Sequence, residues 1–520
     1  MPRLEYPRTS NEPRMHSLIR KSFAFLPTVG MRSAPEELLL ELFREVFYET
    51  HYESGRNNPL DPEADPGDAG RLPYTKGEKA VLYALQGRRK KTRNSRVNRY
   101  YGPAYPALAR NGWFGKNRER IVKEILFSGI VAQHLWHRGP DVKAKKEEQD
   151  RILRLLVEAF IGRRAVEVYG LQGSDILSAA LADGAPTEMD RDLAWDKLLD
   201  ATGYSDKVMR LDSDRFASRI CDDLCALCEL EGELPRMQWL SLLMTFLRFS
   251  LPVYALAQMR LTSMVLDLLV DAIDEGTMPD QERVERSISG RHEQLMRPTI
   301  TPTREVFEQV EEYIRHRVEL NVLLYAVDAT CEQLLLGKSL CVKGGSADRL
   351  SLVQLSSLCR ENSDAIRAVL DDTGDGLPLR NYLVREAEKH LAWKSPRKRG
   401  QGKNIDEFLR VMYRDDLGDE SGGYLLRPVG RGAARGLRVF PGQMLLKTMT
   451  HLAAKKKFAG SARERGRFVL ADVEAHFADY GIDFRDAVGA RPRLIEDLTA
   501  LGLLRGSPDA GSSVAISHPY

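Results

Sequence analysis

Apolar residues recur at helical spacing along most of the 520-residue chain. The segment Pro35–Thr50 shows this spacing, and so does the long run Arg304–Leu336, which Gly337 ends. From Lys116 to about Leu391 the spacing is almost continuous, and alternation with a period of two is scarce. The pattern predicts a mainly α-helical protein without a parallel sheet.

The longest apolar stretch, Met237–Met259, contains Arg248 near its centre and Pro252 shortly after it. A charged side chain is costly at the middle of a bilayer, and the uninterrupted apolar runs are too short to span one. We therefore expect a helix that is buried in a large core rather than a membrane span.

Two stretches of different composition divide the chain. Asn57–Gly70 is dense in Pro, Gly and Asp, and Lys394–Gly436 combines basic residues with Gly. Both are typical of exposed connectors, and a chain of this length is expected to hold about three or four domains. The predicted units are an N-terminal helical segment (1–56), a linker (57–70), a basic aromatic helical region (71–140), an acidic helical scaffold (141–393), a flexible basic linker (394–436) and a C-terminal domain (437–520).

The C-terminal domain shows a clear order of elements. Start and stop signals predict three helices and then two strands that pair across the turn SPDAG. The expected elements are helices over Gln443–Lys457, Asp472–Tyr480 (with Asp472 as N-cap) and Arg491–Leu501, and strands over Leu503–Arg505 and Ser513–Ile516.

Three helices followed by a hairpin, with the sequence LxxLGLLRGSPDAG, resemble a winged-helix module over about residues 440–520. The resemblance implies DNA contact through the third helix and the wing. That helix also carries Glu496 and Asp497, which would repel phosphates although either can accept a hydrogen bond from cytosine. Docking to another protein is therefore the alternative role.

Positive charge is concentrated in two segments. Arg71–Lys123 holds 15 Lys and Arg against 2 Asp and Glu, and Arg427–Arg467 holds 11 against 1, whereas the whole chain carries only +3. The rest of the chain is therefore strongly acidic. Two basic segments in an otherwise acidic protein indicate a polyanionic partner, and nucleic acid is the first candidate.

The first basic segment interleaves cations with aromatic residues, as in RRKKTRNSRVNRYY. Lys and Arg neutralise phosphates and aromatic rings stack on unpaired bases; the alternative is a solvated loop whose rings pack on neighbouring helices. The expected nucleic-acid-binding residues are Arg88, Arg89, Lys90, Lys91, Arg93, Arg96, Arg99, Tyr100 and Tyr101 in this segment, and Lys455, Lys456, Lys457, Arg463, Arg465, Arg467, Arg491 and Arg493 in the C-terminal region.

Three cysteines have a spacing that resembles a known cofactor site. Cys221, Cys225 and Cys228 form CxxxCxxC, the spacing of a radical-SAM iron–sulfur site. Such a site needs a loop that turns the thiolates inward. The surrounding pattern is helical instead, and positions i, i+4 and i+7 form an apolar stripe on which cysteine packs as a small hydrophobe. We expect core packing.

Two further motifs are incomplete. Gly337-Lys338-Ser339 resembles the end of a phosphate loop, but Glu332 stands where the first glycine is required. His134 and His137 lie three residues apart without a third metal ligand. We therefore expect no catalytic residue, no metal site and no cofactor.

These observations favour a cytoplasmic, non-catalytic recognition or adaptor subunit that binds nucleic acid, with DNA favoured over RNA. The acidic helices would contact other protein subunits, and six cysteines without a paired framework fit a reducing compartment. No membrane partner is expected. The overall organisation resembles that of uncharacterised bacterial anti-phage defence-island proteins, which implies a larger defence complex.

Two alternatives stay open on the sequence alone. One is an enzyme whose site is built from dispersed residues, such as a nuclease or an RNA-modifying enzyme. The other is a protein-docking scaffold whose basic segments meet acidic partners.

Overall fold

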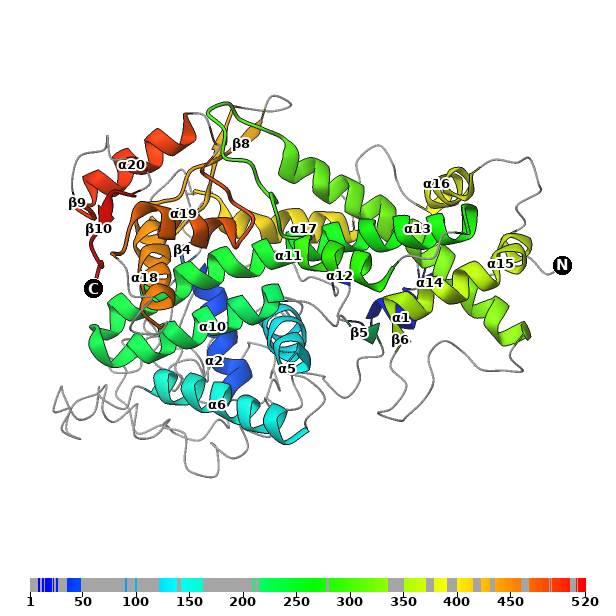
Figure 1. Cartoon of the computed structure of the whole chain (residues 1–520), viewed down its shortest axis with the longest axis horizontal. Coiled ribbons are helices and arrows are strands. Elements are labelled where there is room, and N and C mark those ends of the chain that lie inside the picture. The colour runs from blue at the N-terminus through cyan, green and yellow to red at the C-terminus, as the bar shows by residue number, and fades with distance from the viewer. Residues whose placement is uncertain are drawn as a thin grey trace, which may run out of the picture.

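One long helix, α11 (Arg236–Asp274), runs through the computed structural model of the chain and organises it (Figure 1). From Trp239 to Met259 it is apolar on nearly every face and is buried against neighbours on almost all sides. Among the described residues it is the one helix long and apolar enough to cross a membrane, but 89% of its most apolar window is buried inside the protein. The prediction of a core helix is confirmed.

The structure describes part of the chain. The described residues are 8–9, 12–13, 15–20, 22, 25–26, 35–47, 89–90, 99–100, 121–137, 142–161, 209–210, 215–276, 280–334, 350–370, 378–390, 400–414, 422–430, 435–459, 467–485, 487, 489–505, 511 and 513–520.

These residues are mainly helical, as predicted. The helices are α1 (Ser17–Arg20), α2 (Pro35–Phe47), the π-helix η1 (Val122–Val131), α5 (Ala132–His137), α6 (Val142–Ile161), α10 (Arg215–Glu229), the 3-10 turn η3 (Leu230–Glu233), α11, α12 (Gln281–Gly290), α13 (Glu305–Leu334), α14 (Leu352–Glu361), α15 (Ser363–Val369), α16 (Leu379–His390), α17 (Gly400–Leu409), the 3-10 turn η5 (Arg410–Met412), α18 (Gln443–Ala459), α19 (Leu470–Ala478) and α20 (Ala490–Ala500).

The described strands form two-stranded pairs. Four pairs are antiparallel and one, β5–β6, is parallel. The strands are β1 (Arg8–Thr9) with β2 (Glu12–Pro13), β3 (Arg89–Lys90) with β4 (Arg99–Tyr100), β5 (Met209–Arg210) with β6 (Leu350–Ser351), β7 (Leu426–Val429) with β8 (Gly436–Val439), and β9 (Leu504–Arg505) with β10 (Ala515–Ile516).

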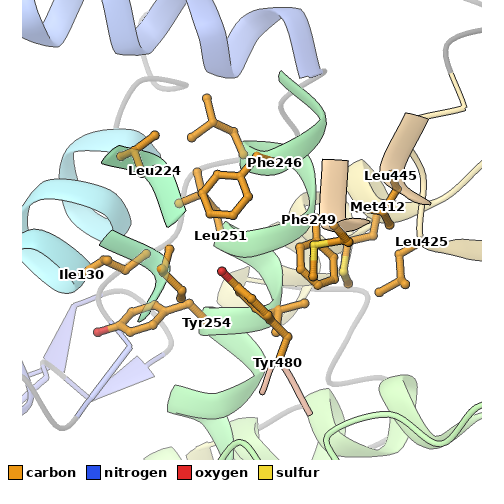
Figure 2. Packing of buried hydrophobic residues seen from close by; sticks show 14 of the residues in the cluster. Ile130, Leu224, Phe246, Phe249, Leu251, Tyr254, Met412, Leu425, Leu445 and Tyr480 are labelled. Carbon is orange, nitrogen blue, oxygen red and sulfur yellow. The ribbon is translucent and has the colours of Figure 1, made fainter. Parts of the chain in front are cut away.

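The first half of α11 lies between elements from distant parts of the chain (Figure 2). Ile130 of η1 and Leu224 of α10 approach it from one side, and Met412 and Leu445 approach it from the other. All of these side chains are at most 1% exposed and belong to one hydrophobic cluster, which extends to the last strand, β10. The C-terminal region therefore shares a core with the helices that precede it.

The second half of α11 belongs to another cluster. There it packs with the later part of α13 and with α14, α15 and α16. Because α11 contributes to both clusters, it joins the two ends of the elongated molecule (Figure 1). Each cluster combines residues from several of the predicted units. The limits of those units stay a prediction.

Regular structure replaces much of the flexible linker that was expected over 394–436. Helix α17 buries Ile405 and Phe408 completely, and β7 begins beside the buried Leu425. The linker prediction is wrong for residues 400–414 and 422–430. The high content of Gly and Arg favoured a linker, although short apolar stretches within it reach the core.

The C-terminal order of elements agrees with the sequence. Helices α18, α19 and α20 and the antiparallel pair β9–β10 occupy the predicted places. One detail is corrected: Val469 is the N-cap of α19, and Asp472 lies at its third position. There the Asp472 carboxylate accepts a hydrogen bond from the Val469 amide at 2.9 Å, which satisfies one free donor at the helix start.

The cysteine stripe packs as predicted. Cys221, Cys225 and Cys228 lie on α10, and all three are at most 5% exposed. Burial raises the pKa of the Cys228 thiol, so it stays protonated and apolar.

Replacement of Cys225 by Ala should therefore act only through packing. We expect it to lower the free energy of unfolding by about 1 kcal/mol, the scale of a small core truncation. Urea unfolding measures this change. Loss of an absorbance band near 400 nm from anaerobically purified protein on the same replacement would contradict a purely packing role.

Candidate nucleic-acid interface

The first predicted binding segment is described only at a short ribbon. Arg89 lies opposite Tyr100, and Lys90 lies opposite Arg99, in the antiparallel pair β3–β4. The other predicted residues of this segment, Arg88, Lys91, Arg93, Arg96 and Tyr101, lie outside the described residues, as does the Gly337-Lys338-Ser339 motif.

The three lysines at the end of α18 are bound by the protein's own carboxylates. Lys455 Nζ lies 3.7 Å from Glu229 Oε2 of α10. Lys456 Nζ lies 2.6 Å from Asp479 Oδ2, and Lys457 Nζ lies 3.1 Å from Asp472 Oδ1. Each of these lysines therefore has a carboxylate partner on α10 or at α19, and Asp479 is shared between Lys456 and Arg219 of α10.

The two predicted arginines of α20 are also paired. Arg491 binds Glu474, a fully buried carboxylate of α19, and the Arg491 pKa is raised by this bond. Arg493 lies 3.0 Å from Glu496 and 3.1 Å from Asp497 on its own helix. The α20 surface therefore offers little free positive charge.

The remaining predicted cations are divided. Arg467, just before α19, is exposed, and no ion pair joins it to another described residue. Arg463 and Arg465 lie outside the described residues. The predicted C-terminal cations that the structure describes thus lie in one region, and most of them form ion pairs with carboxylates of the protein.

The hairpin β7–β8, between η5 and α18, has two different faces. Leu426 and Leu437 point to the core and are 1% and 2% exposed. Arg427 is exposed and lies directly opposite Arg438, which is half-buried. Because opposite residues in an antiparallel pair share a face, the two arginines lie on the same outward side.

Both edges of this hairpin are fixed. On one edge, Leu437 and Thr303 exchange two backbone hydrogen bonds of 2.8 Å. On the other, Tyr413 bridges Leu426 in parallel register, and the Arg414 amide donates to the Leu426 carbonyl at 2.7 Å. The register therefore places Arg414 beside Arg427, so that Arg414, Arg427 and Arg438 form a row across three adjacent chain segments, here called the arginine row.

Aromatic rings support the arginine row. The Arg427 guanidinium lies 5.9 Å from the ring centre of Phe440, and that of Arg493 lies 5.5 Å from the same ring. The Tyr424 ring stacks on Phe440 with centroids 6.5 Å apart, and Arg414 lies 5.5 Å from Tyr424. Cation–π contacts of this kind hold guanidinium groups in place while leaving their N–H groups available.

Comparison with known proteins adds no family to this picture. No protein-family model, curated protein or solved structure matches the chain.

The arginine row was missed from the sequence, although a signal exists. The strands read LLRPV and GLRVF, in which an arginine alternates with apolar residues as in a half-buried strand. Each run is only a few residues long, and the Gly-rich sequence between them favoured a linker instead.

A second polar cluster surrounds His316, at the contact of α11, α13 and α16. His316 of α13 lies between Arg380 of α16, 2.6 Å from Nε2, and Ser263 of α11, 2.7 Å from Nδ1. A guanidinium only donates, so Nε2 accepts and the proton sits on Nδ1, which donates to the Ser263 hydroxyl. His316 therefore cannot remove the serine proton, and burial together with Arg380 lowers its pKa to about 4.

The cavity beside this cluster, of about 290 Å³, therefore lacks an activated nucleophile. Within the part of the chain that the structure describes, no group of three His, Cys, Asp or Glu side chains is placed to hold a metal ion. His134, one of the two histidines considered from the sequence, lies 3.0 Å from Glu148 of α6.

Acid should weaken the fold through His451 of α18, which is 1% exposed and packs edge-on against His518. Burial, and then the charges of His518 and Lys455, lowers the His451 pKa from 6.5 to about 4. The unfolded chain therefore binds a proton at higher pH than the folded protein, and stability present above pH 6.5 is lost as the pH falls toward 4.

We expect His451 to make the free energy of unfolding about 2 kcal/mol lower at pH 5 than at pH 7. Urea unfolding of the wild type and of His451→Leu at both values measures this contribution. The pH dependence should shrink by that amount in the variant, and an unchanged pH dependence would contradict the assignment.

Proposed function

We propose that this chain is a non-catalytic DNA-binding protein whose β7–β8 hairpin contacts the phosphate backbone. The observation that carries the proposal is the arginine row. Arg427 and Arg438 lie opposite each other on an outward face, and within the described residues no carboxylate pairs with either. Uncompensated cations on a fixed, exposed surface attract the DNA backbone independently of sequence.

We further propose that residues 440–520 form a winged-helix module. Its support is the order of α18, α19, α20 and β9–β10, together with the bridge from Val469 to Ala515, which itself pairs with Arg505. In this proposal α20 is the third helix and Arg505, which is exposed, stands at the base of the wing. The paired charges on α20 leave the neighbouring arginine row as the cationic surface that the described residues of this region offer to DNA.

The proposed partners follow from the negative charge of the central helices. The acidic helices between residues 141 and 393 would contact other protein subunits, so the protein would act as a cytoplasmic adaptor that brings a bacterial complex, such as an anti-phage defence complex, to DNA. The experiments below test the DNA contact directly.

Binding should be strong at low salt and fall steeply as salt rises. If about six phosphates are contacted, affinity for duplex DNA should drop roughly a thousandfold between about 50 and 200 mM monovalent salt. Fluorescence anisotropy of labelled duplex DNA, single-stranded DNA and RNA measures this, and we expect the duplex to bind most tightly. The absence of binding to all three polymers at the lower salt would overturn the proposal.

Removal of a compensated lysine should have little effect on DNA binding. Because Lys456 is bound by Asp479, Lys456→Gln should change duplex affinity less than about twofold. The same anisotropy titration measures it, beside Arg427→Gln as the matched single-charge variant. A larger loss for Lys456→Gln than for Arg427→Gln would move the interface to the end of α18.

A further inference from the structure

We infer that Arg427 and Arg438 form a two-sided clamp for a single phosphate group. This inference rests on the proposed function for the source of that phosphate, the backbone of duplex DNA. It adds a specific site and a specific geometry, because one anion would accept hydrogen bonds from both strands of the hairpin at once.

The first support is the register. Residues directly opposite in an antiparallel pair have Cβ atoms about 4.5–5.5 Å apart, and like charges in such a pair destabilise it. Arg427 and Arg438 occupy such a pair in the middle of β7–β8. An anion between them would convert this repulsion into two charge-assisted hydrogen bonds.

The second support is that, among the described residues, no carboxylate forms an ion pair with either member of the clamp. Asp497 lines the same narrow cavity as Arg438, but its carboxylate is bound by Arg493 at 3.1 Å. This contrasts with Lys455, Lys456 and Lys457, each of which has a carboxylate partner.

The third support is rigidity. The inner face of the hairpin is anchored by Leu426 and Leu437 in the core, and Gly442 closes its base, where an added Cβ would lie 2.2 Å from the Gly422 carbonyl oxygen. The Arg427 guanidinium is also held against Phe440. A fixed pair loses little conformational freedom on binding an anion, which favours affinity.

The shape of the charged surface selects the occupant. Arg414 extends the clamp into a row, and neighbouring strands are about 4.8 Å apart, so three guanidinium groups span about 10 Å. Arginine binds phosphate oxygens in a two-pronged manner. A chain of phosphodiesters can occupy such a row continuously, whereas a single carboxylate can occupy only one position.

The ribbon β3–β4 repeats the arrangement. Its register places Lys90 opposite Arg99, in the middle of the other basic segment. Both basic segments of the chain thus place two cations at opposing positions of an antiparallel ribbon.

The test compares stability and binding in the full-length protein. Thermal unfolding is measured in sodium sulfate, sodium phosphate and sodium chloride at equal ionic strength, and duplex DNA affinity is measured by anisotropy. The variants are Arg427→Gln and Arg438→Gln, with Arg286→Gln of α12, whose guanidinium pairs with the exposed Glu282, as the matched control.

If the clamp exists, its variants should lose DNA affinity without losing thermal stability in chloride. In chloride, Arg438→Gln should unfold at the same temperature as the wild type or slightly higher, because a repulsion is removed. Sulfate and phosphate stabilise folded proteins in general, so every variant should unfold at a higher temperature in them than in chloride. The clamp predicts that this rise is larger for the wild type and Arg286→Gln than for either clamp variant. Each clamp variant should bind DNA about tenfold more weakly at about 0.1 M salt and lower the salt slope by about one.

The remaining outcomes distinguish failure of the proposed clamp from failure of the proposed function. Undiminished DNA binding by both clamp variants would overturn the clamp and leave the proposed function standing. A larger stabilisation by sulfate of the wild type and Arg286→Gln than of the clamp variants, without DNA binding by any protein, would support the clamp and overturn the proposed function. A lower unfolding temperature of Arg438→Gln in chloride, with equal stabilisation of all variants by sulfate, would show that the pair is neutralised within the chain and would overturn the clamp.

Discussion

Reversal of both clamp charges, in Arg427→Glu/Arg438→Glu, should lower the affinity for duplex DNA by about a thousandfold at about 0.1 M salt. Both guanidinium contacts to the clamped phosphate are lost, and two carboxylates are placed where the backbone would lie. Because each lost contact removes about one unit from the dependence of log affinity on log salt, the slope should fall by at least about two units. Anisotropy titrations at several salt concentrations give both quantities.

A charge-matched control separates a local contact from the effect of net charge. Lys143→Glu/Arg286→Glu changes the total charge equally, at two exposed residues of α6 and α12. We expect this variant to bind DNA within a few-fold of the wild type, since long-range effects on the surface are screened beyond about 10 Å. An equal loss of affinity in both double variants would show that DNA senses only the overall charge.

The largest expected effect on stability comes from Arg248. Its side chain is 5% exposed in the first half of α11, and it donates to the Val411 and Tyr413 carbonyls, the latter at 2.6 Å. Arg248→Ala would leave both carbonyls unsatisfied and open a cavity beside them. We expect the free energy of unfolding to fall by about 3–5 kcal/mol, as measured by urea denaturation.

The exposed Arg286 again provides the comparison, because Arg286→Ala should change stability by less than about 0.5 kcal/mol. Arg248 also has a consequence for the interface. It holds the segment whose Tyr413 bridges β7, so at temperatures where Arg248→Ala remains folded we expect weaker DNA binding as well. Full stability of Arg248→Ala would show that water replaces the guanidinium.

Most of the helices were predictable because each buries an apolar stripe that can be recognised in the local sequence, and α11 was predictable from its long apolar run. Leu38 and Leu42 of α2, and Leu494 and Leu498 of α20, are spaced as a helix requires, and all four are buried. The C-terminal order was visible for the same reason, with Gly502 marking the end of α20 at a left-handed backbone conformation. None of this needed knowledge of distant contacts.

The candidate site was less predictable because charge compensation is a tertiary property. Lys455 lies opposite Glu229, which belongs to a helix encoded far earlier in the chain, and no local pattern reveals that partner. Lys455, Lys456 and Lys457 look like a binding patch in the sequence, yet they fasten α18 to its neighbours. By contrast, Arg427 and Arg438 are unremarkable in the sequence and become adjacent only through strand register.

The continuous core beneath the C-terminal region has an evolutionary consequence. A domain that moves between genes as an autonomous unit must carry its own interior. Here Leu445 and Phe477 complete an interior whose other walls come from α10 and α11. Transfer of residues 440–520 alone would expose apolar surface on both the transferred part and the remainder, so the C-terminal region and the upstream helices are constrained to change together.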